Sequence, residues 1–264
     1  MSLLNTIQND SNIKETGDSL GGGRTLLESG VYKASIKIAY LTQATTGTVA
    51  LNLVTDINGA EYKESIYITN KDKQTSYVDK NSGEKRHLVG FLTGDAISLL
   101  TTGVSILEQP TERKIVKVWD FTQNKEVPTE VDCLVGLIGK EIQLGIQQET
   151  KFKQAKQADG SYADTAEVLS SNKISYAFHP TNNKTVAECR AKVEVAEFME
   201  EWKKKWTGVT YDRTKGKTPS ASTGTAGAPG NVTKPTSAML VQTNTYPSKR
   251  VSTHLLPLEH YQCT

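Results

Sequence analysis

Apolar and polar side chains alternate over residues 31–41, the first regularly patterned segment of the chain. Because successive side chains of a strand point to opposite faces, a period of two predicts a strand with one apolar face. This pattern is typical of a half-buried sheet and argues against an amphipathic helix at this place. The residues predicted on the apolar face are Tyr32, Ala34, Ile36, Ile38 and Tyr40, and those predicted on the opposite face are Lys33, Ser35, Lys37 and Ala39.

Strand patterns recur along most of the chain, and one helix interrupts them. The dipeptide Asn58-Gly59 tolerates the positive φ values of a tight turn, so it predicts a hairpin within a three-stranded meander. Apolar residues at helical spacing predict a short helix over 91–102, which Gly103 ends. Further strands are predicted over 49–57, 61–69, 114–121, 131–137, 141–150 and 174–178.

The order of these elements predicts a mainly β fold. Five or six strands with one inserted helix suit an OB-like Greek-key barrel, although a β-sandwich would give a similar series. Thr185 and Glu188 form the signature of a capping box and predict a C-terminal helix that ends near Trp206. We expect an N-terminal arm over 1–29, the barrel domain with its C-terminal helix over 30–206, and a flexible, disordered tail over 207–264, rich in Gly, Pro, Ser and Thr.

The charge of the chain is unevenly distributed. Its 31 Lys and Arg residues against 29 Asp and Glu residues give a net charge of +2. From residue 213 onward six basic residues oppose Glu259 alone, so this part carries +5, and subtraction from +2 leaves −3 for residues 1–212. Such a balance does not identify a nucleic-acid partner, because that requires local positive potential on the folded surface.

Three segments resemble the single-stranded DNA-binding proteins of tailed bacteriophages: GDSLGGGRTLLESGVYKASIKIAYLTQA, SIYITNKDK and SYVDKNSGEKRHLVGF. The similarity extends over about residues 5–217 and includes YDRTKGK after the predicted C-terminal helix. It implies an OB-fold, sequence-tolerant binding of single strands, and a role in phage DNA replication or recombination. One departure is the end of the chain, SKRVSTHLLPLEHYQCT, which is neutral to basic. Replicative single-strand binders commonly end instead in an acidic tail that recruits partners.

Binding single strands without reading their sequence requires rings on which bases stack and cations spaced along the phosphates. Lysines and tyrosines lie on the polar faces of the first and third predicted strands and in the polar segment that follows, and two aromatic residues share one face of a later strand. For each ring, packing is about as common a role as stacking, and a lone lysine is more often only solvated. The predicted nucleic-acid-binding residues are Lys33, Lys37, Lys63, Tyr67, Lys71, Lys73, Tyr77, Lys80, Lys85, Arg86, Trp119 and Phe121.

No catalytic constellation is evident, and we predict that the chain is not an enzyme. The four histidines are scattered and the three cysteines lack CxxC spacing, so neither a metal site nor a cofactor is predicted. An odd number of cysteines is more typical of reduced thiols than of a disulfide framework. Asp56, Glu61 and Lys63 are residue types of metal-dependent nucleases, but their close spacing across a turn is more typical of a charged hairpin end.

The expected partner is single-stranded DNA, with phage or host replication proteins as further candidates. No apolar stretch approaches the roughly 20 residues that cross a bilayer, and no secretory signal is recognisable. No membrane partner is therefore predicted, and the expected location is the cytoplasm of the infected bacterial host. Two other functions remain open: a phage structural or protein-interaction β-domain whose lysines are a solvated rim, and a DNA-annealing recombination mediator that shares the binding surface.

Overall fold

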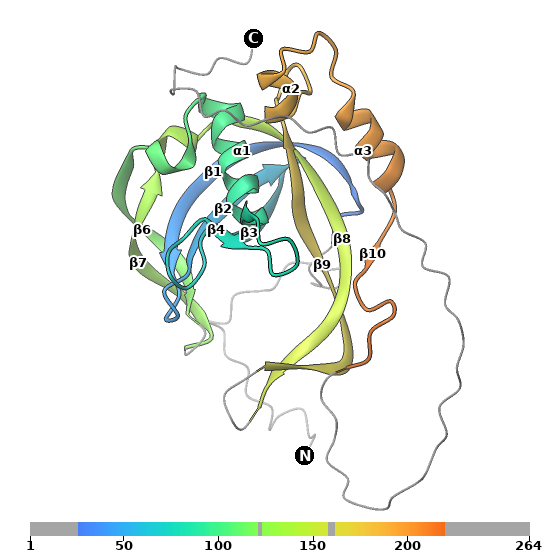
Figure 1. Ribbon diagram of the computed structural model, residues 1–264. Coiled ribbons are helices and arrows are strands. Elements are labelled where there is room, and N and C mark those ends of the chain that lie inside the picture. The colour runs from blue at the N-terminus through green and yellow to red at the C-terminus, as the bar shows by residue number, and fades with distance from the viewer. Residues whose placement is uncertain (1–25, 121–122, 158–161, 220–264) are drawn as a thin grey trace, which may run out of the picture.

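The computed structural model describes residues 26–120, 123–157 and 162–219 (Figure 1). Of these residues 49% lie in strands and 18% are helical, which confirms the prediction of a mainly β fold. The strands are β1 (Gly30–Gln43), β2 (Val49–Ile57), β3 (Ala60–Tyr67), β4 (Ser76–Val78), β5 (Lys85–His87), β6 (Thr111–Asp120), β7 (Lys125–Leu134), β8 (Glu141–Lys156), β9 (Tyr162–Phe178) and β10 (Tyr211–Asp212). The helices are α1 (Val89–Thr102), α2 (Val186–Arg190) and α3 (Phe198–Trp206), with short 3₁₀ turns η2 (Ile106–Glu108) and η3 (Val135–Leu137). No helix in the described part of the chain is long and apolar enough to cross a membrane.

β1 is shared by both halves of an eight-stranded sheet. Its first half pairs with β8, and its second half pairs with β2, which continues into β3 through the predicted turn at Asn58-Gly59. Tyr40 and Leu41 also pair with β7, through which the β6–β7 hairpin joins the sheet. β9 and β10 flank β8, and only the short β10–β8 pairing is parallel. In Figure 1 the β6–β7 hairpin and the long β8–β9 ribbon stand on opposite sides of α1.

The sheet is not closed, so the predicted OB-like barrel is not confirmed. β3 and β9 pair with other strands and not with each other. A side chain connects them instead, because the Oε2 atom of Glu64 accepts hydrogen bonds from the Ile174 N–H at 2.7 Å and from the Tyr62 hydroxyl at 2.6 Å. Burial raises the pKa of the Glu64 carboxyl, although these two donors act in the opposite direction. One carboxyl group thus links the two ends of the open sheet.

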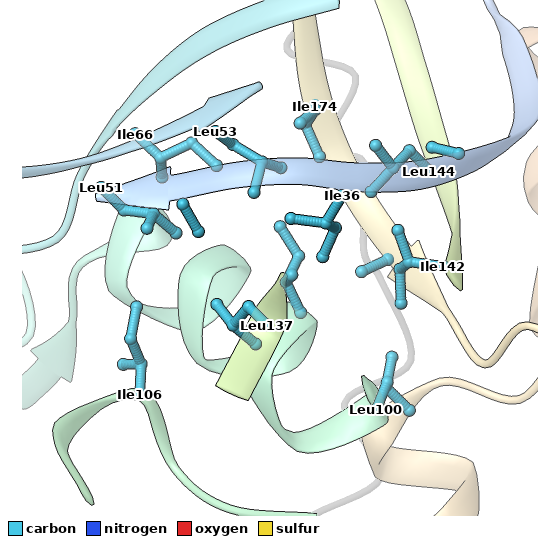
Figure 2. Packing of buried hydrophobic residues seen from close by; sticks show 14 of the residues in the cluster. Ile36, Leu51, Leu53, Ile66, Leu100, Ile106, Leu137, Ile142, Leu144 and Ile174 are labelled. Carbon is cyan, nitrogen blue, oxygen red and sulfur yellow. The ribbon is translucent and has the colours of Figure 1, made fainter. Parts of the chain in front are cut away.

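The main core lies between the inner face of the sheet and α1. Figure 2 shows side chains from the strands and from α1 meeting there. As predicted, α1 ends at Gly103, whose φ of 76° suits a residue without Cβ and whose N–H bonds to the Leu99 carbonyl. The largest side chains that are essentially inaccessible in this cluster are Ile36, Leu51, Leu53, Ile97, Leu134, Leu137, Ile142, Leu144, Ile146 and Ile174.

A β-bulge divides β1 between two apolar clusters. The register with β2 shifts between Ile36 and Ile38, so the intervening Lys37 has no partner in the ladder. One extra residue inverts the faces of all residues beyond it. Ile36 therefore points into the main core, whereas Ile38 and Tyr40 point to the outer face of the sheet. The predicted single apolar stripe is wrong beyond Ile36, because a bulge is invisible in the alternation of residue types.

The second cluster lies on that outer face, beneath the β6–β7 hairpin. It joins β1 and β2 to the hairpin and covers part of the face that the sequence predicts to be polar. Its buried members are Tyr40, Val54, Val131 and Cys133, with Ile38, Val116, Val118 and Val135 packed partly against them.

The C-terminal helical region consists of two helices rather than the predicted single one. The capping box at Thr185 and Glu188 is present and begins α2. Glu188 also begins α3, because its Oε1 atom accepts the N–H groups of Glu197 at 2.9 Å and Phe198 at 3.0 Å. Partial burial acts to raise the pKa of the Glu188 carboxyl, but the N–H donors of Phe198, Thr185 and Glu197 outweigh it, so the pKa lies below its ordinary value.

We expect Glu188→Gln to destabilise the fold by about 1 kcal/mol at neutral pH, because the amide keeps one acceptor oxygen and so one of the two helix starts loses an acceptor worth roughly 1 kcal/mol. A depressed carboxyl pKa contributes stability above the ordinary pKa that is lost as the pH falls through the folded value. The difference between the two proteins should therefore shrink on acidification. Urea unfolding at pH 7 and near pH 3.5 measures it, with the exposed Glu194→Gln as control. Equal stability at pH 7 would contradict this double role.

α3 packs on the outer face of the sheet near the start of β1. Its Trp202 is buried against Met199 and Phe178. Gly145 on β8 makes room, since a Cβ there would lie 3.2 Å from the Phe178 ring and 3.4 Å from the Trp202 ring. The sheet extends past the expected domain boundary at 206, because β10 pairs with β8.

The cysteines depart from the expectation of reduced thiols. Cys133 is buried and unpaired, in keeping with it. Cys189 on α2 is disulfide-bonded, so the expectation is wrong at this position.

Candidate nucleic-acid interface

Residues 68–88, here called the lysine loop, connect β3 to α1. The loop folds into the small hairpin β4–β5, in which Tyr77 lies opposite Arg86. Side chains shape its two bends: the Asn70 Oδ1 atom accepts the N–H of Gln74 at 2.8 Å, and the Asp79 Oδ1 atom accepts the N–H of Asn81 at 2.8 Å. The polar segment after the third predicted strand thus forms a small exposed hairpin.

Close backbone packing fixes where the lysine loop begins and ends. The Thr69 hydroxyl accepts the Val49 N–H at 2.9 Å, which holds the loop to the start of β2. In the turn between β1 and β2, a Cβ on Gly47 would lie 2.7 Å from the Lys71 carbonyl oxygen. At the other end, a Cβ on Gly90 would overlap the carbonyl oxygen of Tyr67. The loop is therefore held against the end of the β1–β2–β3 meander.

The lysine loop carries an excess of unpaired positive charge. Arg86 contacts both Asp79, at 3.3 Å, and Glu84, at 3.0 Å, so this cluster of three charges has a net charge of −1. Asp72 is then the remaining acidic side chain of the loop. Four exposed lysines oppose it, and none forms a salt bridge with another described residue: Lys71, Lys73, Lys80 and Lys85.

Two of the predicted rings lie at the lysine loop and are open to solvent. The side chain of Tyr67, at the end of β3, is 58% exposed, and that of Tyr77, on β4, is 44% exposed. The chain places Lys71 and Lys73 between these rings and Lys80 after them. Rings alternating with cations are the arrangement that stacks bases and contacts phosphates along one strand.

Lys37 and Lys63, on the outer face of the meander, are already paired with carboxylates. Lys37 lies 2.7 Å from Asp56, and this hydrogen bond is the main cause of its raised pKa. Lys63 lies 3.0 Å from Glu61 and 3.2 Å from Glu126, and the bond to Glu61 contributes most to its raised pKa. A phosphate would have to displace these partners, so both lysines are weaker candidates than those of the loop.

The remaining predicted residues lie away from the lysine loop. Lys33 is exposed on β1 opposite Gln143, in the half of β1 that pairs with β8. The Trp119 side chain is 49% exposed, opposite Glu126 and on the face of the β6–β7 hairpin that points away from Val118. That hairpin holds four basic and five acidic residues, so its charge does not favour DNA. Phe121 lies outside the described residues.

Another exposed ring was missed in the sequence. Tyr162 on β9 is 65% exposed and lies opposite Lys156 on the β8–β9 ribbon. Both faces of this ribbon are largely polar, so the alternation that reveals a half-buried strand is absent there. The one signal in the sequence that could have indicated an exposed ring here is a tyrosine surrounded by polar residues.

Comparison with known proteins returns no matching family model and no matching curated protein.

Proposed function

We propose that this protein binds single-stranded DNA without sequence preference and catalyses no reaction. The observation that carries the proposal is the lysine loop, where four exposed lysines, without carboxylate partners among the described residues, lie close in the chain to the exposed rings of Tyr67 and Tyr77. Stacking on a ring is available to every base, and a phosphate contact is independent of sequence. Both interactions thus support binding that tolerates any sequence.

The bound strand would run from the lysine loop across Tyr67 and along the outer face of β3. Beyond Tyr67 this face presents Ser65, whose hydroxyl donates to the Asn52 side chain at 2.6 Å, and then Lys63. Four residues of strand separate Lys63 from Tyr67, a distance of about 13 Å. Because Glu126 forms a salt bridge with Lys63, the tip of the β6–β7 hairpin lies at the far end of this path.

The arrangement of the strands supports an OB-like fold as part of the same proposal. In that fold, oligonucleotides bind across the face of the second and third strands and the neighbouring loops. Here β1 pairs on both sides, α1 lies between β3 and β8 in the chain, and Glu64 connects β3 to β9. The face of β2 and β3 next to the lysine loop is then the binding face.

The resemblance of the sequence to phage single-strand binders supports a role in phage DNA replication or recombination. In this role the protein coats exposed strands, prevents them from re-pairing and shields them from nucleases in the cytoplasm of the infected bacterium. Replication proteins of the phage or host are then its partners.

Titration with labelled oligo(dT) at about 0.05 M and 0.2 M salt tests the proposal, because phosphate contacts make affinity fall steeply with salt. We expect tight binding at the lower salt, weaker binding at the higher, quenching of tyrosine or tryptophan fluorescence, and preference over duplex. Absence of binding, or equal binding to duplex, would reject the proposal and favour a structural or protein-interaction β-domain.

We expect Tyr67→Ala to weaken oligo(dT) binding by about 2 kcal/mol, or roughly 30-fold, because one stacked base is lost. The loss should be similar for oligo(dT) and oligo(dC). Tyr211→Ala is the matched control, since its ring is 44% exposed on β10, at the other end of the sheet from β3. If both variants bind like the parent protein, Tyr67 does not contact the strand.

A further inference from the structure

Five charged side chains gather on the outer face of the meander, at the end of β3 that is farther from the lysine loop. Lys37 lies 2.7 Å from Asp56, and Lys63 lies 3.0 Å from Glu61 and 3.2 Å from Glu126. Asp56 and Glu61 are opposite each other in the β2–β3 ladder, so the two sets of ion pairs are neighbours. These five residues are here called the carboxylate cluster. Three carboxylates against two ammonium groups give the cluster a net charge of −1.

Glu61 connects the two sets of ion pairs electrostatically. The hydrogen bond to Asp56 is the main cause of the raised pKa of Lys37, and the negative charge of Glu61 raises that pKa further. Glu61 also makes the largest contribution to the raised pKa of Lys63. One carboxylate therefore favours the charged form of both lysines. A phosphate that approaches either lysine is repelled by the same carboxylate.

The negative charge of the carboxylate cluster acts on only part of the proposed DNA path. Lys63 lies about 13 Å along β3 from Tyr67, whereas the Debye length at 0.1 M salt is about 10 Å. Repulsion by the cluster is therefore largely screened at the lysine loop, but it acts on a phosphate next to Lys63. A strand bound at the lysine loop can follow β3 only until it reaches the cluster.

We propose that Asp56, Glu61 and Glu126 limit the length of single strand that the protein contacts, because they keep Lys37 and Lys63 from the phosphates. The inference rests on the proposed function and adds to it the residues that set the size of the site. Glu126 reaches the cluster from the β6–β7 hairpin, so the place where this hairpin joins the sheet contributes to the limit.

Replacing the three carboxylates by amides, Asp56→Asn with Glu61→Gln and Glu126→Gln, tests the proposal on the full-length protein. Asparagine keeps an oxygen for the Gly59 N–H, which Asp56 accepts at 2.8 Å, so the turn should be retained. At 0.1 M salt we expect oligo(dT) of about 16 nucleotides to bind about 25-fold more tightly, because two released lysines add about 1.4 to the log–log salt slope. Oligo(dT) of about 4 nucleotides has phosphates enough only for the four lysines of the loop, so its affinity should hardly change.

A matched triple variant separates the carboxylate cluster from a general change in charge. Glu167→Gln releases Lys153 on β8 from its salt bridge. Glu200→Gln releases Lys203 on α3, and Glu201→Gln makes the total change in charge equal. This variant also loses three carboxylates and releases two lysines, but away from the proposed path. It should bind both oligonucleotides with nearly the affinity of the parent protein.

Removing the two lysines from the first triple variant shows whether they cause the effect. With Lys37→Gln and Lys63→Gln added, the gain in affinity for the longer oligonucleotide should disappear. If the parent protein binds with the expected salt dependence and the triple variant shows the same affinity and slope at both lengths, this inference alone is wrong. An equal gain at both lengths, or in the matched variant, would also overturn it. No binding by the parent protein at either length would overturn the proposed function as well.

Discussion

Replacing Lys71, Lys73, Lys80 and Lys85 together by glutamine is expected to weaken oligo(dT) binding roughly 600-fold at 0.1 M salt. Each phosphate contact on single strands contributes about 0.7 to the log–log salt slope, so four contacts contribute about 2.8, and one decade of salt below 1 M converts this into the affinity loss. Binding measured by fluorescence at several salt concentrations gives both the affinity and the slope. The fold should be unaffected, because all four side chains are exposed and without salt-bridge partners among the described residues.

A variant with the same loss of charge serves as the control. Glutamine at Lys184, Lys192, Lys203 and Lys204 also removes four positive charges, but from the α2–α3 region. If binding depends on the lysine loop, this control keeps nearly the full salt slope. If both quadruple variants lose affinity equally, only the overall charge matters and the proposed interface is wrong.

Gly90→Ala is expected to destabilise the protein by about 3 kcal/mol, the upper end of the usual cost of overpacking. A Cβ at this position overlaps the Tyr67 carbonyl oxygen, and a backbone atom cannot swing aside as a flexible side chain does. The start of α1 must therefore move away from the end of β3. Urea unfolding measures the free-energy difference.

The neighbouring Val89→Ala is the control for Gly90→Ala. Val89 is 64% exposed, and alanine favours a helix more than valine, so its stability should be equal or slightly higher. A Gly90→Ala protein as stable as the parent would show that α1 and β3 have room to separate. In that case the lysine loop would not be held as described.

The sequence predicts those elements of the fold whose signals are local. The turn at Asn58-Gly59, the end of α1 at Gly103 and the capping box at Thr185 depend on residues next to one another, and all three are present. The break between α2 and α3 was missed because it depends on Glu188 reaching residues nine and ten positions later. The β8–β9 ribbon was missed over 151–172 because neither of its faces is consistently apolar.

The candidate interface follows the same division. Exposure of Tyr67 and Tyr77 agrees with their positions in the sequence pattern. The sequence pattern does not show which lysines are free to contact phosphates, because the salt bridges of a lysine depend on residues that are distant in the sequence. Glu126, which neutralises Lys63, is 63 positions away and arrives there only because the β6–β7 hairpin joins the sheet next to β1.

The extra residue in β1 affects how related chains should be aligned with this one. Lys37 stands outside the register with β2, so the segments before and after it supply side chains to different sides of the sheet. A homologue that lacks this residue would form a regular ladder with β2 and keep its counterparts of Ile38 and Tyr40 on the outer face. A one-residue gap at this point would therefore mark the loss of the bulge, whereas a gap elsewhere in β1 would move side chains to the other face.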